Sequence, residues 1–141
     1  MNISNDDFSV LLREKGLRVT SPRLTILPVL KEHHHLDAEQ IKNFVKQYLG
    51  TVSTQAVYDS LNIMTTDGIL RRVEPRACRA VYEIDFGDNH HHFVCNSCGQ
   101  LLDVPCSTGE KPCLEANIGS GYSIDEAEVI YWGTCPSCNA K

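Results

Sequence analysis

The sequence lacks any hydrophobic run long enough to cross a membrane, and it lacks a secretion signal. No stretch approaches the ~18 consecutive apolar residues that a membrane-spanning helix requires. The first ten residues are acidic and polar, without the basic start and apolar centre of an export signal. We therefore expect a cytoplasmic protein with no membrane partner, and the 141 residues suffice for one domain or two small ones.

Signatures of several enzyme classes are also missing. The sequence has no HExxH motif, glycine-rich phosphate loop or nucleophile elbow. None of the six histidines is followed two residues later by Glu, as the zinc deaminase signature requires. We therefore predict a protein without catalytic activity.

Basic residues are scarce in the second half of the chain. Residues 1–80 hold eleven of the thirteen Lys and Arg residues against nine carboxylates, a balance of +2. Residues 81–141 hold two basic residues against nine carboxylates, a balance of −7. The first half therefore suits contact with an anion such as nucleic acid, although two solvated surfaces of different charge would give the same counts.

The first half is predicted to form four helices and a hairpin. Turn and capping residues separate four segments with helical periodicity. These helices are expected to start near Ser4 or Asn5, at Ser21-Pro22, after Asp37 and after Ser53. Two β-rich runs follow, at 69–74 and 80–84, with a turn at 75–78. This order is typical of a winged helix-turn-helix domain, predicted for residues 1–84. The inward positions we expect on the second and third helices are Leu24, Leu27, Leu30, Ile41, Phe44, Val45, Tyr48 and Leu49.

A polar, glycine-containing segment at 85–89 predicts a hinge before a second, smaller domain at 90–141. Strands are expected at 92–95, 101–104 and 128–132, with a helix near 113–118. The predicted fold class is therefore α+β, a winged helix-turn-helix domain followed by a small α/β domain.

Six of the seven cysteines lie in the last 47 residues, and four of them form two CxxC pairs. The pairs Cys95–Cys98 and Cys135–Cys138 offer four thiolates, the donor set of a closed, tetrahedral structural Zn²⁺ site. A redox CxxC is the alternative, but the second pair and the absence of a clear βαβ context weigh against it. We predict that this zinc closes the α/β domain onto its own C-terminus.

A run of three histidines precedes Cys95. In a strand, His90 and His92 share one face and His91 takes the other. Together with the oxygens of Glu83 and Asp103, and a second histidine run at 33–35, the pair suits Fe²⁺, Mn²⁺ or Zn²⁺. We expect His33 and His91 to be solvent-exposed histidines without a ligand role.

The fourth predicted helix has a polar stripe opposite Val57, Leu61 and Met64. A helix with such a face after a short turn is a candidate for the DNA major groove, where Gln and Asn read adenine edges. An ordinary solvated face is the alternative. Arginines that could bind DNA phosphates favour the DNA-binding interpretation, namely Arg71 and Arg72 in the hairpin and Arg18 and Arg23 upstream. The stripe consists of Gln55, Tyr58, Asp59 and Asn62.

Over nearly its whole length the chain resembles the ferric uptake regulator (Fur) family. The resemblance is carried by GLRVTSPR, STQAVYDSL, DGILRRV, YEIDFGDNHHHFVCNSCGQLLDV and IYWGTCPSC, and other details resemble the FurA branch, linked to catalase-peroxidase control. It implies a homodimeric, metal-dependent repressor of iron or oxidative-stress genes that binds double-stranded operator DNA. A zinc-uptake regulator of the same family, or a zinc-stabilised protein-interaction module without DNA binding, are the alternatives.

The resemblance also implies roles for individual residues. The structural zinc falls on the four CxxC cysteines, Tyr58 matches a base-contacting tyrosine, and Arg18 matches a basic residue that can reach the minor groove. The regulatory Fe²⁺ or Mn²⁺ site, between the domains, falls on His35, Glu83, His90, His92 and Asp103.

Three positions depart from the family pattern. Asp59 replaces the usual basic or amide residue, so the operator is expected to differ. Ala127 replaces a histidine of an additional metal site, and Asn89 stands near the hinge, so that site is not expected. Cys106 and Cys113 could form a redox pair or be two buried free cysteines.

Overall fold

The computed structural model describes residues 5–75, 79–109 and 111–141. The chain divides into two compact units, Met1–Phe86 and Gly87–Lys141, with the boundary inside the segment at 85–89. Among the described residues, no helix is both long and apolar enough to span a bilayer.

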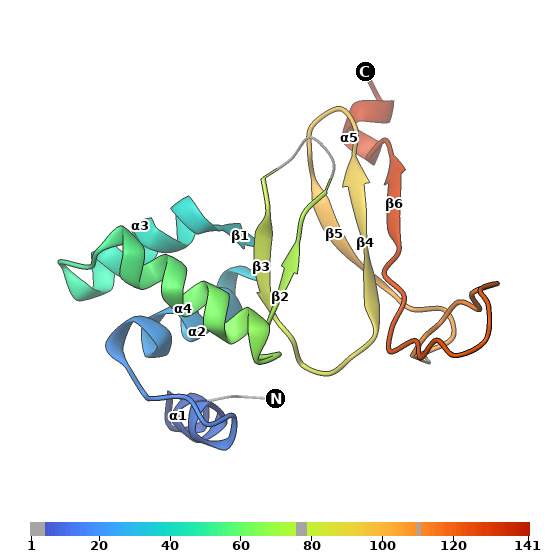
Figure 1. The fold of residues 1–141 in the computed structure, drawn as a ribbon. Helices are drawn as coiled ribbons and strands as arrows, with labels where there is room; N and C mark the ends of the chain where they lie inside the picture. The colour runs from blue at the N-terminus through green and yellow to red at the C-terminus, as the bar shows by residue number, and fades with distance from the viewer. Residues whose placement is uncertain (1–4, 76–78, 110) are drawn as a thin grey trace. The chain divides into compact units, whose positions relative to one another are not determined.

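Four helices form most of the N-terminal unit (Figure 1): α1 Asn5–Glu14, α2 Ser21–His33, α3 Ala38–Leu49 and α4 Thr54–Thr66. The cap of α2 is Thr20, one residue before the expected start, and its hydroxyl accepts from the Arg23 N–H. The predicted capping box of α3 is present, since Asp37 and Gln40 bond each other's backbone N–H groups. Ser53 caps α4 as predicted. These caps satisfy N–H groups that a helix start leaves without intrahelical partners.

A three-stranded sheet with the order β1-β3-β2 completes this unit. The hairpin is confirmed: β2 (Leu70–Val73) pairs antiparallel with β3 (Val81–Ile84). The turn residues 76–78 lie outside the described residues. The two-residue strand β1 (Leu36–Asp37) was not predicted, because two residues cannot show periodicity. Helix, turn, helix and hairpin together make the predicted winged helix-turn-helix.

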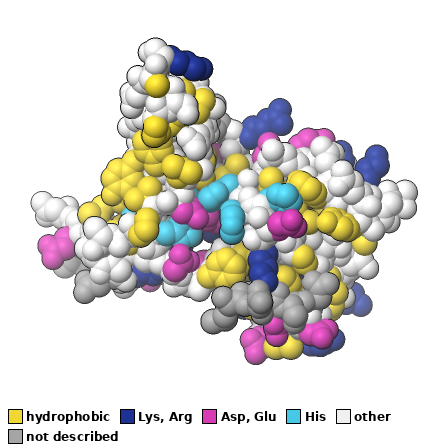
Figure 2. Space-filling model, turned by 180° about the vertical axis from the view of Figure 1, so that it is seen from behind, with side chains coloured by type: hydrophobic (Ala, Val, Ile, Leu, Met, Phe, Trp, Pro, Cys, Tyr) yellow, Lys and Arg dark blue, Asp and Glu magenta, His cyan; other side chains and the backbone are white. Residues whose placement is uncertain are grey.

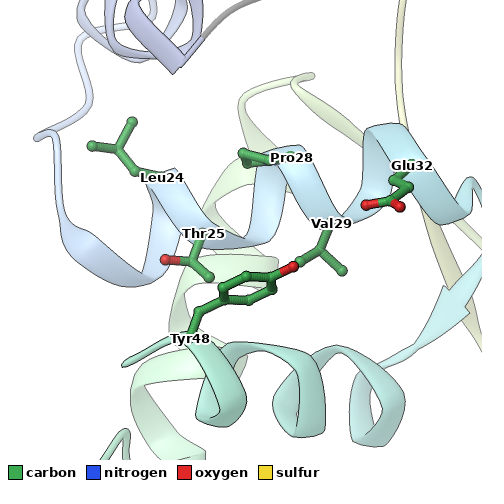
Figure 3. Close-up of a pocket in the computed structure, with 6 residues that line it drawn as sticks. All are labelled: Leu24, Thr25, Pro28, Val29, Glu32 and Tyr48. Carbon is green, nitrogen blue, oxygen red and sulfur yellow. The ribbon is translucent and has the colours of Figure 1, made fainter. Parts of the chain in front are cut away.

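The core of the N-terminal unit comes from the inward faces of α1 to α4 and from the sheet. Leu27, Leu30, Ile41 and Val45 are buried as predicted, whereas Leu24, Phe44 and Leu49 are partly buried. The prediction for Tyr48 is wrong: its side chain is 68% exposed. It lies between α3 and α2 beside a surface pocket of ≈220 Å³ that Pro28 also lines (Figure 3). The helical period placed Tyr48 at the edge of the buried stripe, where a phenol can keep its hydroxyl in water.

The C-terminal unit is built on a second three-stranded sheet with the order β5-β4-β6 (Figure 1). β4 (His90–Cys95) pairs antiparallel with β5 (Leu101–Pro105) and parallel with β6 (Ile130–Gly133). The expected strands are therefore present within two residues of their predicted starts and ends. A short helix, α5 (Pro136–Asn139), follows β6 and was not predicted.

The prediction of a helix near 113–118 is wrong, since these residues form no helix. Leu114 is 57% exposed and Ile118 52% exposed, so no packed surface stabilises a short amphipathic turn there. Isolated helices of this length are unstable in water, and Gly119 follows at once.

Candidate metal centres and nucleic-acid interface

Two tight turns bring together the four cysteines of the CxxC pairs. Cys95 ends β4, and Cys135 is the residue before α5, so each pair curls back on itself at the end of a sheet element. All four Sγ atoms lie within 4.8 Å of one another, and those of Cys98 and Cys135 are 3.7 Å apart. The Cys135 N–H also donates to the Cys95 Sγ across 3.3 Å. Residues 40 positions apart thus form one thiol cluster.

The thiols of this cluster differ strongly in acidity. Hydrogen bonds from the Cys98 and Cys135 backbones lower the pKa of Cys95 to about 6. Hydrogen bonding to Cys135, together with burial, raises the pKa of Cys138 to about 12. The Cys95 thiol therefore ionises more readily than the Cys138 thiol.

These observations fit a bound zinc ion. Four convergent sulfurs match the ligand number of structural Zn²⁺, and a divalent cation would stabilise the thiolate form of all four. A set of four thiolates leaves no open ligand position, so it suits a structural rather than a catalytic ion.

A second donor set lies in the C-terminal unit, where His90 and His92 of β4 face Asp103 of β5. The Nε2 atoms of His90 and His92 are 3.5 and 3.4 Å from the same carboxylate oxygen of Asp103. His90 Nδ1 is 2.8 Å from the carboxylate of Asp88. A carboxylate behind a histidine holds the proton on Nδ1 and leaves Nε2 available for a metal ion.

Asp88 was missed by sequence reasoning because it lies in the segment interpreted as a hinge. Its position two residues before His90 was the available signal, since alternate residues of an extended chain share a face.

The remaining residues of the expected regulatory set lie in the N-terminal unit. Pairing of β1 with β3 places Leu36 opposite Tyr82, and the neighbouring His35 Nε2 is 2.7 Å from Glu83 Oε2. Each unit therefore brings part of the expected set together: His35 with Glu83 in the N-terminal unit, and His90 with His92 and Asp103 in the C-terminal unit. Carboxylate and imidazole donors of this kind fit Fe²⁺, Mn²⁺ or Zn²⁺.

The expectation of solvent exposure is wrong for His91, which is only 3% exposed. The alternation predicted for the three histidines is observed, and His91 contacts Cys113 on the face away from Asp103. His33 is exposed as expected and stacks on Phe44 with ring centroids 4.4 Å apart.

Helix α4 has the two faces that its sequence pattern predicts. Val57, Leu61 and Met64 are fully buried, and the residues of the polar stripe are exposed. The Gln55 amide donates to the Asp59 carboxylate across 2.7 Å, so Asp59 holds the amide along the helix. Tyr58 carries an aromatic ring at 37% exposure.

Two of the four arginines expected to contact phosphates, Arg72 and Arg23, bond a neighbouring residue. Arg72 forms a 2.7 Å ion pair with Glu74, and it lines one surface hollow of ≈330 Å³ together with Tyr58. Arg23 donates to the Arg18 carbonyl at 2.7 Å, and the Arg18 side chain is exposed. Arg71 is half-buried on β2. On the face drawn in Figure 2, Lys and Arg side chains are scattered singly among acidic and neutral ones.

Comparison with known proteins gives consistent matches along the chain. Residues 14–131 match the model of the ferric uptake regulator family. The chain is 49% identical over 133 residues to the transcriptional regulator FurA of Mycobacterium tuberculosis, covering 94% of this chain and 90% of the relative. It is 48% identical over 128 residues to ferric uptake regulation protein 1 of Mycolicibacterium fortuitum, covering 91% and 80%. The fold matches that of the Helicobacter pylori ferric uptake regulator with a TM-score of 0.72 at 19% identity, covering 99% and 97% of the two chains.

Proposed function

This chain belongs to the ferric uptake regulator family, and from that membership we propose that it is a metal-dependent transcriptional repressor of iron or oxidative-stress genes. In this proposal it binds double-stranded operator DNA as a cytoplasmic homodimer, without a membrane partner and without catalytic activity. The observation that carries the proposal is the presence, in one chain, of a four-thiol cluster and of histidine–carboxylate donors in both units.

The two donor sets define the proposed switch. His35 and Glu83 supply two ligand groups from the N-terminal unit, and His90, His92 and Asp103 supply three from the C-terminal unit. Neither group alone completes the octahedral shell that Fe²⁺ and Mn²⁺ favour. In the proposed switch, one Fe²⁺ or Mn²⁺ ion takes ligands from both groups. Such an ion shifts the equilibrium between two conformations only if it binds one of them more tightly than the other.

The exposed face of α4 is the proposed reading surface for DNA. Tyr58, Gln55 and Asn62 lie on its exposed side and could reach base edges in the major groove. Arg18, Arg71 and Arg72 are proposed to contact the backbone, the first in or near the minor groove. Because Asp59 holds the Gln55 amide, we expect Gln55 to read an adenine only after this 2.7 Å hydrogen bond opens.

Exposed apolar side chains in the C-terminal unit support the homodimer. A second copy of the chain could cover such side chains. Those of 37–72% exposure are Leu102, Leu114, Ile118, Tyr122, Ile124, Tyr131 and Trp132.

The experiment is an anaerobic operator-binding titration. An operator is first selected from a random duplex library with zinc-loaded protein and Mn²⁺, and binding is then followed by fluorescence anisotropy with Fe²⁺, Mn²⁺ or Zn²⁺. We expect Fe²⁺ or Mn²⁺ to tighten binding, and the affinity to fall steeply with salt. Activation by Zn²⁺ alone would favour a zinc-uptake regulator, and no salt-dependent binding to any duplex would favour the protein-interaction module.

A double variant tests the placement of the regulatory site. His90→Ala with His92→Ala keeps all four cluster cysteines and should give a zinc-loaded dimer whose DNA affinity no longer responds to Fe²⁺ or Mn²⁺. His34→Asn is the matched control, because His34 is exposed and belongs to neither donor set. Undiminished metal activation in the double variant would contradict the assignment.

A further inference from the structure

The function proposed above leaves one cluster of donor atoms unused. His91 of β4 meets two cysteines, Cys106 directly after β5 and Cys113 in the connection that leads to β6. One side-chain donor atom from each residue lies within 4.8 Å of the other two. All three residues belong to the C-terminal unit, and none is part of the four-cysteine cluster.

The surroundings of the cluster are polar and well ordered by hydrogen bonds. His91 Nε2 is 3.2 Å from Cys113 Sγ, an edge length close to the 3.7 Å between sulfurs in the four-cysteine cluster. The Asn89 amide donates to Cys106 Sγ across 3.3 Å, and the Thr108 hydroxyl lies 3.4 Å from the same sulfur. The Cys106 N–H in turn donates to the Asn89 carbonyl across 3.3 Å.

The acidity of the two thiols repeats the pattern of the four-cysteine cluster. Hydrogen bonding from Thr108 lowers the pKa of Cys106 to about 6. Burial, and then the neighbouring Cys106, raise the pKa of Cys113. The first negative charge on the pair therefore forms more easily than the second, which a bound cation would stabilise.

We propose that His91, Cys106 and Cys113 form a second thiolate-containing metal site for a zinc-class divalent cation, separate from the four-cysteine site. Two thiolates and one imidazole are a frequent donor set for zinc, with a fourth position open to solvent or another ligand. Thiolate donors also select against Mn²⁺, which prefers oxygen. The site therefore differs in metal preference from the His90, His92 and Asp103 set on the other face of β4.

A disulfide between Cys106 and Cys113 is the competing interpretation. It would leave the buried His91 without a role at the two sulfurs, whereas a metal ion uses all three converging side chains. Metal binding through Nε2 of His91 requires the ring proton to be on Nδ1. In the structure, this Nδ1 accepts a hydrogen bond from the Val129 N–H at 3.3 Å. Metal binding would therefore break the hydrogen bond between Val129 and His91 and form a metal–nitrogen bond. The Val129 amide signal then reports whether the metal site is occupied.

Such an ion would hold together a long irregular connection. Between Pro105 and Ile130 the described residues contain neither helix nor strand. Cys106 and Cys113 lie in this connection, and His91 anchors it to the central strand of the sheet. The proposed site thereby supplies a local constraint that apolar packing does not.

The test is an anaerobic Co²⁺ titration of the full-length, zinc-loaded and thiol-reduced protein. Zinc in the four-cysteine cluster is spectroscopically silent, and the His90, His92 and Asp103 set contains no sulfur. A sulfur-to-cobalt charge-transfer band therefore reports the proposed site. We expect this band to reach the intensity of one Co²⁺ held by two thiolates per chain, with zinc remaining at one per chain and the Val129 amide resonance shifting in step with the band.

Variants assign the band to its sulfurs. Cys106→Ser should reduce the band to about half, because one of two thiolates remains. Cys106→Ser with Cys113→Ser should abolish it while the structural zinc stays at one per chain. His34→Asn should leave the band unchanged.

Two results would overturn the proposal. Absence of the band in the wild-type protein is one, and it does not depend on any variant folding. A band that persists in the double cysteine variant is the other, because the cobalt would then occupy the four-cysteine cluster. None of these measurements involves DNA, so failure here and failure of the proposed repressor function are distinguishable.

Discussion

The two units of this chain are stabilised in different ways. Sixteen buried apolar side chains form a continuous core, and all of them lie in the N-terminal unit. Among the described residues of the C-terminal unit, the buried apolar side chains are those of Val94, Cys95 and Cys135. Two of these three are proposed zinc ligands. Burial of apolar surface therefore stabilises the first unit, whereas we propose that the second depends on metal ligation and on a second copy of the chain that covers its exposed apolar side chains.

The difference follows from size and sequence. A unit of about 55 residues is only marginally stabilised by hydrophobic burial, and small domains commonly add metal ions or a partner. The charge distribution differs as well, since the unit proposed to contact DNA has nearly all the basic residues. Four predictions test this comparison, beginning with the largest effect.

Removing one zinc ligand should unfold the C-terminal unit and spare the N-terminal one. In Cys95→Ser or Cys138→Ser we expect loss of tightly bound zinc and of the dimer, because structural zinc contributes on the order of 10 kcal/mol to folding. The readouts are metal analysis, sedimentation, and fluorescence of Trp132, the only tryptophan, which lies in β6. The helical circular dichroism of the N-terminal unit should persist. Recovery of a zinc-free folded dimer would contradict the comparison.

Two matched leucine truncations should separate core from surface. Leu27→Ala removes a fully buried side chain of α2 and should lower the free energy of unfolding by ~2–5 kcal/mol. Leu102→Ala removes a side chain that is 45% exposed, and should cost the isolated fold less than ~1 kcal/mol while weakening the dimer. Urea unfolding followed by circular dichroism measures the first effect, and sedimentation measures the second. Equal losses of folding stability would mean that the C-terminal unit has a core of its own.

Two variants of the N-terminal unit should separate base reading from phosphate contact. Tyr58→Ala should weaken binding to the selected operator by ~1–3 kcal/mol and leave random DNA nearly unaffected. Arg71→Ala should weaken binding to all sequences and flatten the salt dependence. Tyr48→Ala, an exposed tyrosine on α3, is the control and should change neither. Base reading by Tyr58 is excluded if its loss weakens operator and random DNA equally.

The smallest effect concerns a helix cap. Ser53→Ala removes the hydroxyl that accepts from the Ala56 N–H at the start of α4, and should lower stability by ~1 kcal/mol. Ser123→Ala, an exposed serine in the irregular connection of the C-terminal unit, should change stability by less than ~0.5 kcal/mol. Thermal unfolding of the two variants side by side measures the difference. A larger effect from Ser123 would reveal order in that connection beyond what its exposure indicates.

Local signals predicted the N-terminal unit well. The box of Asp37 and Gln40, the cap at Ser53 and the alternation of the hairpin act between residues close in sequence, so they can be recognised without the fold. The same signals failed at 113–118, because a helical pattern there has no surface to pack against. The prediction that Tyr48 is buried was wrong for a related reason. Periodicity indicates which way a side chain points, but not where the core ends.

By itself, the sequence determined the chemistry of this protein: four thiols in two CxxC pairs, two histidines on one strand face, and a helix with a polar stripe. These depend on residue type and spacing, which fix the number and kind of donor atoms. Only the tertiary structure revealed Asp88 behind His90, the short strand beside His35, and the convergence of His91 with Cys106 and Cys113. Each depends on strand pairing or on the course of an irregular connection. The spacing of residues along a chain does not encode such distances in space, because sheet register and loop closure decide them.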